Sequence, residues 1–122
     1  MQKKLCLFSA PRKFIDKSVF KNKKINFYFK EIWKKSEIKK KNLKIYSWIV
    51  NPGQNFKIDE KILKFYPNLK YIVTPSTGSN HISMQDCKKR KIKVFSLLHN
   101  RKELNNIKAS SEFTFLLLLN SL

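Results

Sequence analysis

Five short apolar segments recur along the chain, and they constrain its fold more than any other feature. They are rich in aromatic and β-branched residues, which favour strands. Successive segments begin 18 to 26 residues apart. Such an interval leaves room for a helical crossover, which parallel strands require. The five predicted strands are Leu5–Phe8, Ile25–Phe29, Leu43–Val50, Leu69–Thr74 and Ile92–Leu97.

The intervals between these segments contain helix signals of unequal strength. Asp59–Tyr66 has most of its apolar residues on one face, and Ser83–Arg90 ends in basic residues that suit a helix C-terminus. Phe14–Phe20 has a weaker apolar face, and Lys30–Asn42, with six lysines, fits either a helix or a long polar loop. The sequence therefore predicts an α/β fold: a flavodoxin-like five-stranded parallel sheet with flanking helices.

The fourth segment leads directly into a turn and a capped helix. Ser83 is a good N-cap residue, Asp86 follows it by three positions, and Ile82 and Cys87 are placed as a hydrophobic staple. In open α/β sheets the ligand lies in the crevice at the carboxyl ends of the strands. The turn Ser76–Asn80 is therefore the expected place for a binding site.

Backbone N–H groups of Ser76, Thr77 and Gly78 can form a nest for a carboxylate, and glycine allows a close approach of the backbone. On spacing alone this signal is weak, because every βα connection needs a turn. Asn51–Gln54 follows the third predicted strand, and whether it lines the same crevice is left open.

The net charge of +19 raises the question of an anionic partner. The positive residues are 24 Lys and only 3 Arg, whereas bidentate recognition of phosphate and guanine favours Arg. A solvated lysine-rich surface is therefore favoured, and no sequence-specific nucleic acid binding is expected. A small basic domain that binds nucleic acid or an anionic partner without catalysis stays open as an alternative.

Several kinds of chemistry have no signature in the chain. Cys6 and Cys87 lack a CxxC or His partner spacing, so they are read as buried reduced thiols in a cytoplasmic protein, and no metal site is expected. The only glycines are Gly53 and Gly78, so no G-x-G-x-x-G phosphate-binding loop can be written. The longest apolar run, Phe113–Leu119, is too short to span a bilayer.

Three stretches carry a resemblance to a known family: PNLKYIVTPSTGSNHIS, KKRKIKVFSLL and IKASSEFTFLLLL. In this order and at similar spacing they resemble the substrate domain of the D-isomer-specific 2-hydroxyacid dehydrogenases, the family of phosphoglycerate dehydrogenase. The clear likeness covers roughly residues 62–119. Ser83 departs from the Asp that the family usually has, and both residues are good N-caps.

The resemblance implies roles for several residues, and for His81, at a helix entrance, it implies a structural rather than an acid–base role. The turn Ser76, Thr77 and Gly78 would hold the carboxylate of a 2-hydroxy or 2-oxo acid, and Thr77 would lie near the nicotinamide of NAD. Glu112 matches a family position and could make an interdomain contact, whereas His99 is expected at the surface. The family's catalytic Arg, acidic residue and His would lie beyond this sequence. A full-length homodimer is implied, with this chain alone inactive.

The last segment is apolar nearly all round as a helix, so it needs cover on more than one side. The expected organisation is a substrate-binding domain over 1–106, with 107–122 starting an interdomain helix that would lead into a missing nucleotide-binding domain. The sequence is therefore expected to be truncated. A third interpretation is a scaffold or regulatory domain that oligomerises through this helix.

Overall fold

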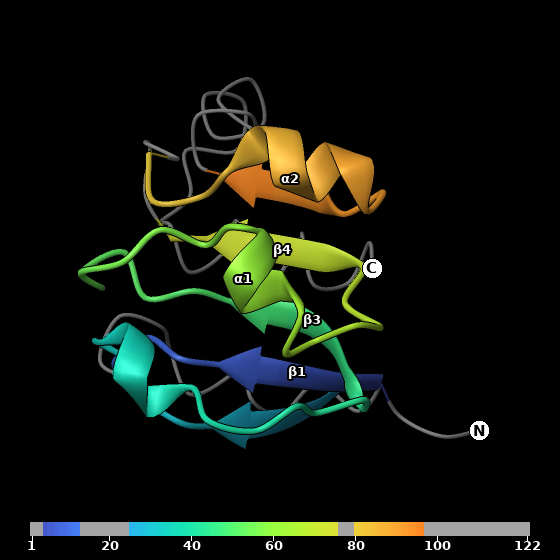
Figure 1. Cartoon of the computed structure of the whole chain (residues 1–122). Coiled ribbons are helices and arrows are strands. Elements are labelled where there is room, and N and C mark those ends of the chain that lie inside the picture. The colour runs from blue at the N-terminus through green and yellow to red at the C-terminus, as the bar shows by residue number, and fades with distance from the viewer. Residues whose placement is uncertain (1–3, 13–24, 76–79, 97–122) are drawn as a thin grey trace, which may run out of the picture.

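The computed structural model describes residues 4–12, 25–75 and 80–96, which form a five-stranded parallel sheet in the order β2-β1-β3-β4-β5 (Figure 1). This order confirms the predicted flavodoxin-like arrangement. The third and fourth strands start two residues later than predicted, at Ile45 and Tyr71. The third strand excludes Leu43, whose side chain is 62% exposed and does not join the buried face. The strands are β1 Lys4–Phe8, β2 Ile25–Phe29, β3 Ile45–Ile49, β4 Tyr71–Thr74 and β5 Lys93–Ser96.

The first face of the sheet packs against the described helices and the loops beside them. Trp48, at the centre of β3, is fully buried there, and the ring of Tyr66 meets it edge to face with 5.2 Å between centroids. Ile62 and Leu63 from one helix and Cys87 from another complete this cluster. Burying one large apolar side chain stabilises a fold by about 1.5–3 kcal/mol, so this cluster is the main source of stability.

The opposite face is built largely from aromatic rings. Phe8 of β1 lies against Phe29 of β2 with centroids 5.6 Å apart, and Phe27 stacks on Phe29 at 5.9 Å. Cys6, Ile49 and Val73 are buried among them. The central strands are therefore covered on both faces, as their continuous apolar sequences predict.

Two short helices lie on the first face. α1, Glu60–Leu63, is capped by Asp59, and α2, Met84–Lys89, is capped by Ser83, whose Oγ accepts from the Asp86 N–H at 3.3 Å. The predicted cap at Ser83 is thus confirmed. α1 ends at Leu63, before the helix end predicted at Tyr66. The N–H groups of Phe65 and Tyr66 donate to carbonyls three residues earlier, which is the 3-10 pattern and not the α-helical one.

The segment 30–42 is a loop and not a helix. Its only regular part is the 3-10 turn η3, Lys35–Glu37. The Glu37 carboxylate accepts from the backbone N–H groups of Trp33 and Lys34, and Ile32 and Ile38 anchor the two ends in the core. The predicted helical segments 14–20 and 107–122 lie outside the described residues.

Candidate functional site

Buried polar residues gather at the carboxyl ends of the strands. In the described part of the chain six polar residues are buried, and all except Ser47 lie at or just beyond these ends. Figure 1 shows the strands running in the same direction, so these ends share one edge of the sheet. The residues of this carboxyl edge are Ser9, Asn51, Gln54, Thr74 and Ser96.

Ser9 follows β1 and has a structural role that its contacts define. Its Oγ accepts a hydrogen bond of 2.7 Å from the Trp48 indole N–H and donates to the Ile49 carbonyl at 3.3 Å. The Ser9 N–H also donates to Ile49, at 3.0 Å. Ser9 therefore connects β1 to β3 and satisfies the one polar group of a buried tryptophan.

The turn after β3 is held by Asn51, which is fully buried. Its Nδ2 donates to the Ile32 carbonyl at 3.0 Å, and its Oδ1 accepts from the Gly53 N–H at 2.9 Å. Gln54, 8% exposed, donates through Nε2 to the Phe56 carbonyl, while its Oε1 has no hydrogen-bond partner. The structure thus places Asn51–Gln54 at the same edge as the predicted site, with an unoccupied acceptor at Gln54.

The turn after β4 is fixed at both of its ends. Thr74 Oγ1 and His81 Nε2 are hydrogen-bonded at 3.0 Å across it. Ile58 pairs with Ile82 in an isolated parallel bridge, through the Ile58 N–H to His81 carbonyl and Ser83 N–H to Ile58 carbonyl bonds, both 2.8 Å. The predicted site residues Ser76, Thr77 and Gly78 themselves lie outside the described residues.

His81 is half-buried, and this burial lowers its pKa below the ordinary value. The neutral ring is therefore the dominant form at neutral pH, with one nitrogen engaged by Thr74. These contacts agree with the predicted structural role. His99 and Glu112 lie outside the described residues.

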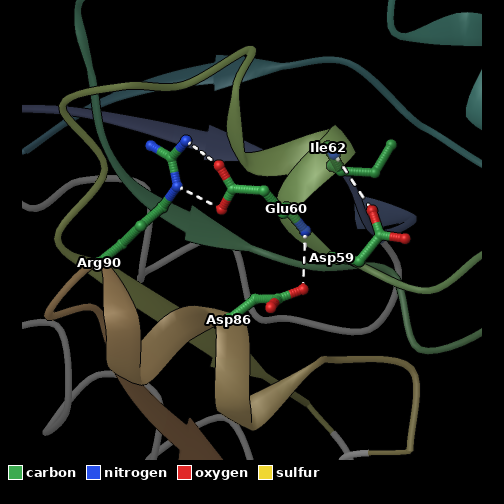
Figure 2. Close-up of polar contacts among 5 residues, drawn as sticks. All are labelled: Asp59, Glu60, Ile62, Asp86 and Arg90. Atoms are coloured by element: carbon green, nitrogen blue, oxygen red, sulfur yellow. Dashed lines mark hydrogen bonds and ion pairs between the residues drawn. The ribbon is translucent and has the colours of Figure 1, made fainter.

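A polar network joins α1 to α2 (Figure 2). Asp86 Oδ2 accepts from the Glu60 N–H at 2.9 Å, at the positive N-terminus of α1. The Arg90 guanidinium binds the Glu60 carboxylate through two nitrogens, with Nε to Oε2 at 2.8 Å. Sequence reasoning missed this network, because the partners lie 26 and 30 positions apart and no local pattern links them.

The two thiols are buried and free, as predicted. Burial raises the pKa of Cys6 to about 12 and that of Cys87 to about 11, so neither is a nucleophile at neutral pH. Within the described residues no group of three or more His, Cys, Asp or Glu side chains could hold a metal ion. The same residues include no helix long and apolar enough to cross a membrane.

Comparison with protein families gives a match over residues 7–99 to the model described as D-isomer specific 2-hydroxyacid dehydrogenase, catalytic domain. This range contains the described sheet except the first three residues of β1, and it contains the whole carboxyl edge. A comparison with curated proteins gives no match. Nothing in the comparisons supports the nucleic-acid alternative.

Solved structures share the fold. D-lactate dehydrogenase from Aquifex aeolicus, solved in complex with NAD and lactic acid, is 25% identical with a TM-score of 0.52, and the match covers 75% of this chain and 27% of that enzyme's chain. The pyruvate reductase of Chlamydomonas reinhardtii is 13% identical with a TM-score of 0.57, covering 77% and 29%. The NAD+-bound 3-phosphoglycerate dehydrogenase of Entamoeba histolytica is 21% identical with a TM-score of 0.51, covering 78% and 33%. The chain thus spans no more than about a third of their length.

Proposed function

Because this chain belongs to the D-isomer specific 2-hydroxyacid dehydrogenase family, we propose that it supplies the substrate-binding domain of an NAD-dependent oxidoreductase. The substrate would be a small 2-hydroxy acid or the corresponding 2-oxo acid. Support comes from the family match and from the 25% identity to a D-lactate dehydrogenase. The division at residue 106, a full-length homodimer and a cytoplasmic location stay predictions.

The proposed binding element is the turn after β4, with the backbone N–H groups of Ser76, Thr77 and Gly78 on the substrate carboxylate. The observation that carries this proposal is the anchoring of both ends of the turn, by the Thr74–His81 hydrogen bond and the Ile58–Ile82 bridge. A nest of N–H groups binds an anion well only when its backbone is held in place.

His81 contributes position rather than charge in this proposal. Its lowered pKa leaves it neutral at neutral pH, so the substrate carboxylate would be bound by backbone dipoles and not by an imidazolium. The Thr74 contact keeps the ring pointing back to β4. The proton of the substrate hydroxyl would have to be moved by another group.

The described residues do not fit NAD. Gly53 is the one glycine among them, and a Cβ there would lie 2.8 Å from Trp33 Cζ3. The space that this glycine leaves is therefore occupied by an indole and not open to a pyrophosphate. We expect calorimetric titration of NAD into this chain to show no saturable binding. Thr77 near the nicotinamide stays a proposal.

The test is a titration of the ¹⁵N-labelled chain with D-lactate and pyruvate, followed by NMR. We expect the amide signals between Thr74 and His81 to shift with a Kd on the order of millimolar, since a single carboxylate is recognised. Neutral lactamide should leave them unchanged. Gly78→Pro, which deletes one N–H donor, should abolish the shifts, whereas the control Lys61→Gln, at an exposed position of α1, should keep them. Spectral dispersion reports whether each variant is folded.

Shifts spread evenly over lysine-rich segments, or retained in Gly78→Pro, would contradict the proposal. Such results would show that the anions respond only to the net positive charge of the chain. Shifts caused equally by lactamide would show that the carboxylate is not the recognised group.

A further inference from the structure

A hollow of about 380 Å³ lies beside the edge strand β2, and the proposed function does not use it. Tyr28 of β2 forms one side, the loop residues 38–42 form another, and Tyr66 follows α1. This volume is within the range of small-molecule sites.

The floor of the hollow is aromatic. Tyr66 is 7% exposed and is fixed by its edge-to-face contact with Trp48. Burial, with Tyr28 nearby as a second cause, raises the pKa of Tyr66 to about 12, so its hydroxyl keeps its proton. Neither tyrosine hydroxyl has a hydrogen-bond partner among the described residues. Tyr28, which is 41% exposed, thus offers its ring to a ligand, and Tyr66 lines the hollow beside it.

The rim of the hollow is positively charged. Lys30, Lys39, Lys40 and Lys41 line it, and among the described residues no carboxylate does. The last three are exposed and make no ion pair within the described residues. Only Lys30 has a protein partner, the Glu37 carbonyl, at 3.1 Å. Like charges gathered in this way repel one another, and a bound anion would offset that repulsion.

The loop that contributes three of these lysines is held in place. The Asn42 N–H donates to the Phe65 carbonyl at 2.8 Å, next to Tyr66. Ile38 is buried in the core at the other end of the lysine run. The loop that carries Lys39, Lys40 and Lys41 is therefore anchored at both of its ends, which keeps these lysines beside the two tyrosines.

We propose that this hollow binds a small organic phosphate. The lysines bind the phosphate group, which carries up to two negative charges, and the organic body packs against the rings of Tyr28 and Tyr66. The site is separate from the carboxyl-edge turn after β4. It goes beyond the proposed function and does not depend on it.

Phenyl phosphate is the probe, because it combines both chemical features. The full chain is titrated by calorimetry at about 150 mM salt, where diffuse electrostatic binding is weakened. The triple variant Lys39→Gln, Lys40→Gln, Lys41→Gln should bind at least about tenfold more weakly. Its charge-matched control is Lys57→Gln, Lys61→Gln, Lys88→Gln, which removes three exposed lysines outside the hollow and should change affinity less than about twofold.

Further probes test the contributions of the ring and of the phosphate group separately. Tyr28→Ala should weaken phenyl phosphate severalfold and leave inorganic phosphate unchanged, because it removes a ring and no charge. Phenol, which has the ring without the phosphate, should not bind measurably.

Equal losses in the two triple variants would overturn the proposal, since they would show binding by net charge alone. Absence of saturable binding of phenyl phosphate to the parent chain would overturn it as well. Equal affinity for phenyl phosphate and inorganic phosphate would refute the role of the tyrosine rings.

Discussion

The hydrogen bond from Trp48 Nε1 to Ser9 Oγ lies where β1 meets β3, and both residues are fully buried. Ser9→Ala leaves the indole N–H without an acceptor. The Ile49 carbonyl, to which Ser9 Oγ also donates, keeps the Ser9 backbone N–H at 3.0 Å and stays satisfied. The substitution therefore leaves one buried group, the Trp48 indole N–H, without its hydrogen bond.

An orphaned buried donor costs about 1–3 kcal/mol, so Ser9→Ala should lower the free energy of unfolding by that amount. On a Trp48→Phe background no indole N–H exists, and the same substitution should cost less than about 0.5 kcal/mol. Urea unfolding followed by circular dichroism measures all four variants of this cycle. Equal costs of Ser9→Ala on the two backgrounds would refute the assigned role of the bond.

Three further predictions concern α2 and the thiols. Ser83→Ala should lower stability by about 0.5–2 kcal/mol and Ser83→Asp should be nearly neutral, since only Ala lacks a capping oxygen; equal urea midpoints would contradict this. Arg90 lowers the pKa of Glu60 below 4.5, so their pair stabilises the fold above that pH and this contribution is lost as pH falls through the lowered value. Glu60→Gln should therefore flatten the stability–pH curve in acid, and an unchanged curve would exclude the pair as a cause. Cys6 and Cys87 should react with a thiol reagent only on unfolding, because burial raises both pKa values, so fast labelling of the native chain would disprove their burial.

The strands were predictable because each is a local apolar segment. Ile25–Phe29 has its predicted bounds, and the cap at Ser83 follows from residue types within one turn. The loop 30–42 was not predictable, because its shape depends on Glu37 binding two backbone N–H groups and on Ile32 and Ile38 reaching the core. Local propensity does not contain such tertiary contacts.

The candidate site, too, was only partly predictable from the sequence. The expectation of a binding site at the carboxyl edge follows from the topology, which the strand spacing predicted. The hydrogen bond between Thr74 and His81 joins residues seven positions apart, and no pattern of neighbouring residues predicts it. The roles of Ser76, Thr77 and Gly78 stay predictions.

The bridge between Ile58 and Ile82 also determines where the chain can be rearranged by engineering. Inserted domains and circularly permuted termini are tolerated at exposed loop positions whose backbone makes few contacts. New termini at Ile58 or Ile82 would separate two connections that hold each other through backbone hydrogen bonds. The exposed backbone around Lys40 offers a permissive alternative, so a permuted protein opened there should retain the sheet and its carboxyl edge intact.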